Sequence, residues 1–351
     1  MARFSFWTFL VVLIVIRYLS AQPHYPEGTR LKITTRVSQE PIRYSFKQSL
    51  SLLGLKVYLP LYPEISYGDQ VVIIGEVKGK ELVNANLVSV TESKNWLFKF
   101  RKRIIEFYRA CLPEPHASLV AGIVLGSKSQ IPVDFWQALK DKGVAHVVVA
   151  SGMNVAFVAS FLLSFLALFG PRRRILPLVL IGIWIYALLA GFEAPIIRAA
   201  VMVSLALGAQ SSGRLATVWR IWIISALGML IFNPLWLKDT GFWLTFVATG
   251  SLILFEKPIR RSLKVVPAIL REGFSTTLAA QIGVTPILFV TFGQFNIWSP
   301  LVNLAVLWTV PLIMIIGTVA GVIGLLIPGL ARLTLYLCYP LTWWFIAVVK
   351  L

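Results

Sequence analysis

A series of long apolar segments dominates the chain after His146. They cover residues 147–169, 175–192, 195–211, 217–232, 241–255, 274–292, 300–327 and 331–350. A segment in hydrocarbon must satisfy its own backbone amides and carbonyls, because lipid offers them no water, and a helix does so. Several of these segments approach the ~20 residues that cross a ~30 Å hydrocarbon core. The sequence therefore predicts a polytopic α-helical membrane protein, in which residues 146–351 form a multi-helix membrane domain.

Basic residues between the apolar segments predict the orientation. Arg172–Arg174, Arg220 with Arg214, and the run 257–264 fall between alternate segments, whereas the loops around Glu193 and residues 233–239 carry few positive charges. Cytoplasmic loops accumulate Lys and Arg, so we expect the basic loops inside. The apolar stretch within residues 1–20 then crosses the membrane from inside to outside as an uncleaved anchor. The segment that follows it lies on the outer side of the membrane.

Residues 21–95 have a different pattern of apolar and polar residues. Leu31, Ile33, Thr35 and Val37 alternate with polar residues, which is the period-two pattern of a half-buried strand. Similar runs at 42–47, 50–59, 70–77 and 82–90 are separated by turn signals such as Gly68-Asp69. Five short strands predict a small closed β-barrel of the OB type on the outer side of the membrane, with an SH3-like barrel as the alternative.

Residues 96–145 connect this domain to the apolar half. The stretch 96–112 predicts an amphipathic helix with Lys99, Arg101, Lys102 and Arg103 off its apolar face, which is typical of a helix on a membrane surface. The apolar run 119–125 is too short to span, so we expect a re-entrant or interfacial segment there.

The chain offers little for catalysis. Its three histidines are not spaced as metal ligands, and the two cysteines lie far apart. The segment from Gly122 to Ser129 departs from the phosphate-loop spacing, and no strand precedes it. We therefore expect no enzymatic activity, no catalytic residue, no metal and no cofactor.

Polar residues interrupt the apolar half in clusters. Such residues at membrane depth need partners, so they face another helix or a wet cavity. Helix packing and pore lining both fit the first cluster, which contains Ser151 and Asn154. Arg198, in the second cluster, suits either a bound phosphate or an ion pair with Glu193 or Asp239. The candidate residues are His146, Ser151, Gly152, Asn154, Glu193, Arg198, Asp239, Gly241, Phe242 and Asn303.

These clusters resemble the motifs of the ComEC family of competence proteins. The matching segments are 143–154, 186–199 and 233–246, with further matches at 122–126 and 299–303. The resemblance runs from about residue 120 to the end, and a small barrel also precedes this region in the family. Two positions depart from the pattern: Asn154 stands where the family has a histidine, which removes a titratable group, and Thr245 replaces a serine.

The resemblance implies a channel that passes single-stranded DNA across the cytoplasmic membrane of a bacterium during natural transformation. The candidate residues above would line its path. The β-domain would guide the strand with basic and aromatic side chains, namely Arg30, Lys32, Arg36, Arg43, Tyr44, Phe46 and Lys47.

The resemblance also indicates partners besides membrane lipids and DNA. The sequence carries no ATP-binding motif, so the driving force is expected from a cytoplasmic motor or a DNA-binding protein. Many family members continue into a metallo-β-lactamase-like domain, whereas this sequence ends at Leu351, so any strand degradation is expected from a separate nuclease. Two other functions also fit the residues: a transporter or flippase of a small or lipid-linked anion, and a membrane scaffold for an extracellular complex.

Overall fold

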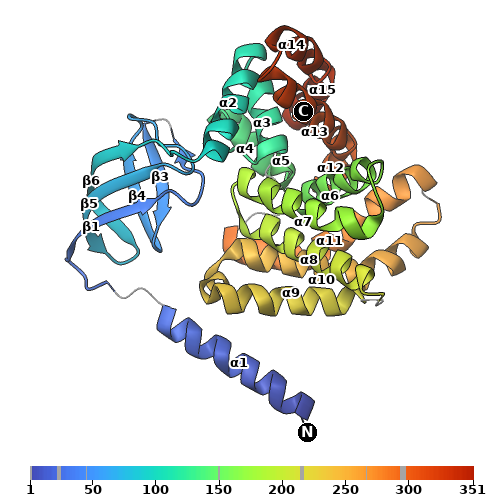
Figure 1. Cartoon of the computed structure of the whole chain (residues 1–351), viewed down its shortest axis with the longest axis horizontal. Coiled ribbons are helices and arrows are strands. Elements are labelled where there is room, and N and C mark those ends of the chain that lie inside the picture. Colours follow the sequence, from blue (N-terminus) through green and yellow to red (C-terminus); the bar gives the residue numbers. More distant parts are fainter. Residues whose placement is uncertain are drawn as a thin grey trace. The chain divides into compact units, whose positions relative to one another are not determined.

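The computed structural model describes residues 2–21, 25–44, 46–148, 151–213, 217–265, 267–292 and 298–351 (Figure 1). The chain divides into two compact units. Unit 1 comprises Met1–Gln22, Val158–Trp184 and Ala194–Leu304, and unit 2 comprises Pro23–Phe157, Ile185–Glu193 and Ala305–Leu351.

A six-stranded sheet opens unit 2. Its strands follow the order β1-β5-β6-β4-β3-β2 and pair antiparallel, except for β4 and β6, which are parallel. Alternate apolar residues of the strands, including Ile33, Val57 and Ile73, are buried in one core. The strands are β1 (Arg30–Arg36), β2 (Ile42–Arg43), β3 (Lys47–Leu52), β4 (Leu55–Pro60), β5 (Gln70–Lys78) and β6 (Glu81–Thr91).

The sheet differs from the predicted barrel in three respects. The predicted strand 42–47 is instead β2 and the first residue of β3, two strands that pair antiparallel. The segment 50–59 is not one strand, because Leu53 and Gly54 adopt positive φ angles of 50° and 85° and turn the chain into the hairpin of β3 and β4. The sheet order also starts at β1 and ends at β2, and no ladder joins these two strands in the part of the chain that the structure describes. The sheet is therefore open, and the closed OB-like barrel is not confirmed.

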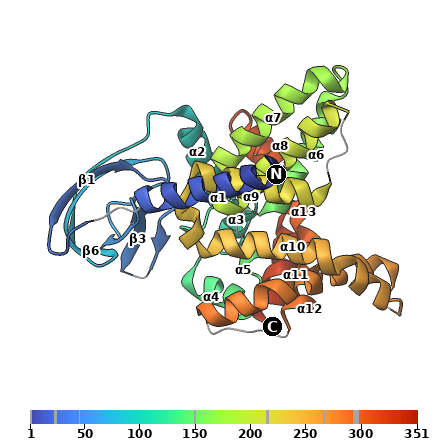
Figure 2. The ribbon, with the colours of Figure 1, turned by 90° about the horizontal axis from the view of Figure 1, so that it is seen from below.

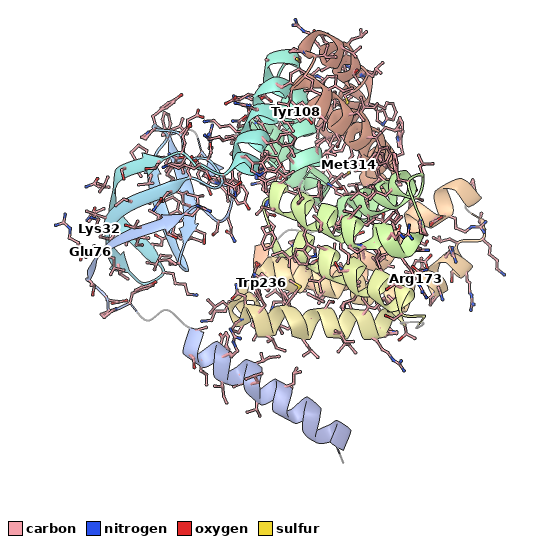
Figure 3. The ribbon with its side chains drawn as sticks, in the orientation of Figure 1. Lys32, Glu76, Tyr108, Arg173, Trp236 and Met314 are labelled. Atoms are coloured by element: carbon pink, nitrogen blue, oxygen red, sulfur yellow. The ribbon has the colours of Figure 1, made fainter. Side chains whose placement is uncertain are left out.

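Helices complete unit 2. They are α2 (Trp96–Cys111), α3 (His116–Leu125), α4 (Val133–Asp141), α5 (Ala145–Val148), α13 (Thr309–Gly324), α14 (Pro328–Tyr336) and α15 (Tyr339–Lys350). The apolar face of α2 packs on α3 and α13, and Figure 3 shows Tyr108 of α2 and Met314 of α13 in this bundle.

Small residues let α13 approach α2 and α3 closely. A Cβ atom added at Gly321 would lie 2.6 Å from the Tyr108 hydroxyl, and one added at Gly317 would lie 2.8 Å from the Val124 side chain. The Tyr108 hydroxyl donates to the carbonyl of Gly317 at 2.8 Å. A glycine every fourth residue is a typical contact face between membrane helices.

Unit 1 is helical. It holds α1 (Ala2–Ala21), α8 (Ala194–Ser211), α9 (Val218–Phe232), the 3₁₀ turn η1 (Pro234–Lys238), α10 (Thr240–Ser262), α11 (Ala268–Phe292) and α12 (Ser299–Leu307), with most of α6 (Gly152–Leu166) and α7 (Arg172–Leu189). Phe242 and Phe246 of α10 pack with Ile197 and Met229 in its core. Helix α1 contacts α9 and η1, and Figure 2 shows it alongside α9.

The apolar segments form helices, as predicted. Four are long and apolar enough to cross a membrane: Ala145–Leu166, Ala194–Ser211, Thr240–Ser262 and Arg271–Thr291. Two further helix pairs, α12 with α13 and α14 with α15, are each bent by 42° and raise the number to six if each pair is one span. Helices α9 and α3, of 15 and 10 residues, are shorter than a span.

Candidate functional site

The C-terminus of α3 lies inside unit 2. All ten residues of this short helix are buried, and the chain leaves it at Gly126, whose φ of +69° ends the helix. The last carbonyls of a helix have no partner within it, and burial makes an unpaired carbonyl costly. Donors from other segments are therefore required at this point.

Three side chains supply those donors. Asn154 donates its Nδ2 to the carbonyl of Ile123 at 2.8 Å. The Tyr186 hydroxyl reaches the carbonyl of Val124 at 3.3 Å, and Arg101 Nη2 reaches that of Leu125 at 3.3 Å. The three donors come from α2 and from the parts of α6 and α7 that belong to unit 2, so the end of α3 joins these segments within unit 2. A cation at this end also suits the negative pole of the helix dipole.

Arg101 connects four segments of unit 2. Besides Leu125, its Nε donates to the carbonyl of Leu189 at 2.8 Å, and its Nη2 lies 3.1 Å from Glu40 Oε2. Its guanidinium carbon is 5.3 Å from the centre of the Tyr67 ring. The side chain is only 6% exposed, so these contacts replace its hydration.

Glu40, between β1 and β2, receives four donors. Arg101 Nη2 is joined by Ser127 Oγ at 2.7 Å, the Lys128 amide at 2.9 Å and Ser129 Oγ at 3.1 Å. Burial alone would raise the pKa of this carboxyl group, but the Arg101 charge and the hydrogen bonds outweigh it and lower the pKa below its ordinary value. Glu40 is therefore a buried carboxylate held in its charged form.

The side chain of Lys128 forms a separate ion pair. Its Nζ lies 2.6 Å and 2.8 Å from the two carboxylate oxygens of Glu193. Glu193 was a candidate for the path and for pairing with Arg198, and the structure gives it Lys128 as partner. We name the residues Glu40, Arg101, Ser127, Lys128, Ser129 and Glu193 the carboxylate hub.

Sequence reasoning missed most of the hub. It placed Arg101 on the polar side of its helix, yet Arg101 is buried with Ile104, Ile105 and Tyr108. The spacing 101, 104, 105 and 108 is that of one helix face and could have indicated a buried arginine. Nothing local distinguishes Glu40 from the other acids of the domain, because its donors come from residues 61 to 89 positions away.

Arg198 forms a second polar centre, in unit 1. Its Nη1 contacts the hydroxyl of Thr249 and lies 3.6 Å from the Met202 sulfur. Its guanidinium carbon is 5.9 Å from the centre of the Phe246 ring. No carboxylate lies within ion-pair distance of Arg198 among the described residues, and its buried Nε has no hydrogen-bond partner there.

The other candidates of unit 1 have structural contacts. Asp239 Oδ1 accepts from the Gly241 amide at 2.9 Å and so caps α10 rather than pairing with Arg198. Phe242 is buried in the helical core. Asn303 is also buried, and its Nδ2 donates to Ser299 Oγ at 3.3 Å.

The first polar cluster belongs to unit 2. The side chain of His146 is exposed, Ser151 Oγ lies 3.3 Å from Asn154 Oδ1, and Gly152 begins α6. Asn154 therefore bridges Ser151 and α3. The candidates of the apolar half fall into two units, so their convergence on one path stays a prediction.

The β-domain candidates lie in two groups. Arg30, Lys32 and Arg36 are exposed on one face of β1, beside the exposed acid Glu76 of β5 (Figure 3). The second group lies at the other end of the sheet order, on and beside β2 and β3. It consists of Arg43, Tyr44, Phe46 and Lys47.

The second group combines aromatic rings with charge. Phe46 is 90% exposed and Tyr44 is 44% exposed. Lys47 Nζ lies 5.9 Å from the centre of the Tyr44 ring and 4.5 Å from that of Tyr58, a β4 residue that the sequence did not single out. Arg43 is instead paired with Glu64 at 3.0 Å.

No group of three or more His, Cys, Asp or Glu side chains suited to a metal ion occurs in the described ranges. What the structure contains is an N-terminal sheet followed by several apolar helices with buried polar centres. This architecture is consistent with a multi-pass protein of the inner membrane.

The chain belongs to the Competence protein family, whose model matches residues 123–351. It is 28% identical over 243 residues to ComE operon protein 3 of Bacillus subtilis (strain 168), covering 68% of this chain and 31% of that protein. It is 30% identical over 191 residues to Competence protein ComA of Neisseria gonorrhoeae, covering 50% and 28% respectively. An uncharacterized protein of Escherichia coli (strain K12), YcaI, is 26% identical over 219 residues, covering 58% and 29%.

The chain thus spans less than a third of the length of these three curated relatives. No solved structure matches it.

Proposed function

We propose that this protein passes single-stranded DNA through the bacterial cytoplasmic membrane during natural transformation. Its membership in the Competence family, over a region that includes Arg198 and the polar clusters, carries this proposal. The named relatives include a competence protein and a ComE operon protein.

The surroundings of Arg198 support an anionic cargo. A charged side chain within a membrane span is costly unless it is paired or faces a wet path. Arg198 lies in a candidate span, and its described neighbours are a hydroxyl, a thioether and an aromatic ring. A guanidinium that lacks a carboxylate partner can bind a phosphate through two N–H groups. We therefore propose Arg198 as a contact for the DNA backbone.

Helix α1 supports the proposed orientation. Lys238 of η1 lies 5.3 Å from the centre of the Tyr18 ring, near the C-terminal end of α1. Helix α10 begins beside η1 and ends with Arg260 and Arg261. If those arginines are cytoplasmic, α1 runs outward and the β-domain follows it on the outer side.

The exposed surface of Tyr44, Phe46 and Lys47 supports a strand-guiding role for the β-domain. Single strands bind by stacking bases on aromatic side chains and by contacts between phosphates and basic groups. We propose this surface, with Tyr58, as the first contact for DNA. Arg30, Lys32 and Arg36 form a weaker contact, because the negative charge of Glu76 lowers the net positive charge of that face.

The remaining elements of the proposal follow from the chemistry of transport. The passage of DNA requires a motor or a DNA-binding protein on the cytoplasmic side, and a separate nuclease would supply any strand degradation. The chain itself is proposed to act as a channel without catalysis.

Transformation tests the proposal. Arg198→Ala, with normal expression and membrane insertion, is expected to abolish import of labelled DNA into the cytoplasm. Arg172→Ala is the matched control, since Arg172 is exposed and its side chain donates a hydrogen bond to Gln210. Normal DNA import in the Arg198→Ala strain would refute the role of Arg198.

Vesicle transport separates the alternatives. The purified protein in sealed vesicles is assayed for uptake of small anions, and a deletion strain is assayed for DNA import. Anion uptake in the vesicles together with intact DNA import in the deletion strain would favour an anion transporter or flippase. A scaffold for an extracellular complex predicts that Ser151 and Asn154 tolerate substitution without loss of function, provided the protein folds.

A further inference from the structure

We propose that the donors around Glu40 form a binding site for a phosphate group, and that the Glu40 carboxylate fills this site as a built-in competitor. The inference deepens the proposed function, because the phosphodiester backbone of DNA is one ligand of this class. A phospholipid headgroup presents the same chemistry.

The donor set is that of an oxyanion site. It consists of one guanidinium, two serine hydroxyls and one backbone amide, all on a single carboxylate at 2.7 to 3.1 Å. Arginine, hydroxyl groups and backbone N–H groups in a turn are the donors that proteins commonly present to phosphate. The amide and both hydroxyls come from residues 127–129, directly after Gly126, whose left-handed conformation turns the chain there.

Space for a larger anion adjoins the carboxylate. A cavity of about 110 Å³ is lined by Glu40, Arg101, Ser127 and Ser129. Four basic residues, Arg43, Lys99, Lys102 and Arg109, and four acids, Glu64, Asp69, Glu92 and Glu106, also line it. Two of the lining residues have buried polar atoms with no partner among the described residues, Arg43 Nε and Gln130 Oε1. Arg43 Nη2 is already paired with Glu64, so Nε is the donor of this side chain that we propose for a ligand. Removal of the Glu40 side chain would extend the space to the four donors.

The acid that now fills the site comes from a different element than the donors. Glu40 lies in the short connection between β1 and β2, whereas its donors lie on α2 and after α3. A shift of this connection would withdraw the carboxylate and leave Arg101 with no acid partner. A phosphate that takes its place restores the charge balance, so ligand binding and movement of the connection are coupled.

Anion rescue of a Glu40 variant tests the site. In the purified full chain, Glu40→Ala is expected to lower Tm, because it leaves the buried Arg101 unpaired. Inorganic phosphate is expected to restore Tm, whereas chloride at equal ionic strength does not. Wild type should show little phosphate effect, and removal of the competitor should tighten the apparent Kd for phosphate by about tenfold or more.

Glu76→Ala is the matched control, since it removes one exposed acid of the same domain and should give no phosphate effect. Glu40→Gln keeps an acceptor for the serines and the Lys128 amide, and so covers the case in which Glu40→Ala does not fold. It should bind phosphate more tightly than wild type. A phosphate response in either variant should disappear when Arg101→Met is added.

Two further probes identify the source of the phosphate. Binding of a fluorescent oligothymidylate that tightens in Glu40→Ala indicates DNA. Binding to phosphatidylglycerol vesicles, but not to phosphatidylcholine vesicles, that tightens in the same variant indicates an anionic lipid. If neither the melting temperature nor the Kd responds to phosphate in Glu40→Ala and Glu40→Gln, the hub is a structural ion pair and the inference is wrong.

The rescue experiment does not depend on DNA import. A strain carrying the wild-type protein that fails to import DNA, while the purified variants still respond to phosphate, would refute the proposed function and leave the phosphate site standing. Normal import without any phosphate response would do the reverse.

Discussion

Substitution of Arg101 by methionine measures what the carboxylate hub contributes to stability. The change keeps an unbranched side chain of similar length but removes the hydrogen bonds that Arg101 donates to Glu40, Leu125 and Leu189. Removing one partner of a buried pair costs about 3–5 kcal/mol, because the other charge stays buried without compensation. With side chains 6% and 5% exposed, Arg101 and Glu40 fall in this class.

Thermal unfolding of the purified full chain at pH 7 provides the measurement. A loss of 3–5 kcal/mol corresponds to a fall in Tm of about 6–20 °C, at roughly 2–4 °C per kcal/mol for a folding unit of 150–250 residues. The double variant Glu40→Gln/Arg101→Met should be more stable than Arg101→Met alone, since it no longer buries an unpaired charge.

The pH dependence gives a second readout with a defined sign. In wild type the pKa of Glu40 is below its ordinary value of 4.5, so the pair stabilises the fold above pH 4.5 and this contribution is lost as the pH falls through the lowered pKa. Without Arg101, the charge and the hydrogen bond of its guanidinium no longer oppose burial, so we expect the pKa of Glu40 to rise. The deficit of Arg101→Met should therefore shrink as the pH falls from 7 toward 5. A Tm change below about 2 °C, or a deficit independent of pH over this range, would refute the reasoning.

Three further substitutions test separate contacts. Asn154→Ala should cost about 1–3 kcal/mol, because it leaves the buried Ile123 carbonyl unsatisfied, and Asn154→His, which keeps a donor, should cost less in the same thermal assay; equal costs would contradict this. Gly321→Ala should destabilise by about 1–3 kcal/mol through overpacking, since its methyl group would meet the buried Tyr108 hydroxyl, whereas Gly329→Ala, where a Cβ meets nothing within 4 Å, is the control. Phe46→Ala should weaken binding of a single-stranded oligonucleotide by about 1–3 kcal/mol in fluorescence anisotropy, with Leu53→Ala, at another exposed apolar position, leaving it unchanged.

Local pattern explains what was predicted well. The helices after residue 146 follow from the length and hydropathy of contiguous segments, and the alternation in residues 31–37 reports one strand and its buried face. The hairpin at Leu53 and Gly54 was missed because residues 50–59 form one mostly apolar run, and a turn there depends on two positive φ angles that composition does not disclose.

The order of the strands in the sheet could not be predicted from the sequence, for a different reason. Closure of a barrel depends on pairing between strands far apart in the chain, and the alternation within each strand is the same in an open sheet. The sequence therefore predicted strands and their faces, while the tertiary structure decided that the order runs from β1 to β2 without closing.

The sequence by itself determined the long apolar segments, the family and the presence of polar residues in apolar surroundings, because these depend on residue type and on spacing along the chain. Only the tertiary structure decided the partners of those residues: Lys128 for Glu193, the start of α10 for Asp239, and Arg101 for Glu40. A buried charge is stabilised by whichever groups the fold brings within about 3 Å of it. That distance is set by packing between distant segments, and no local pattern in the chain records it.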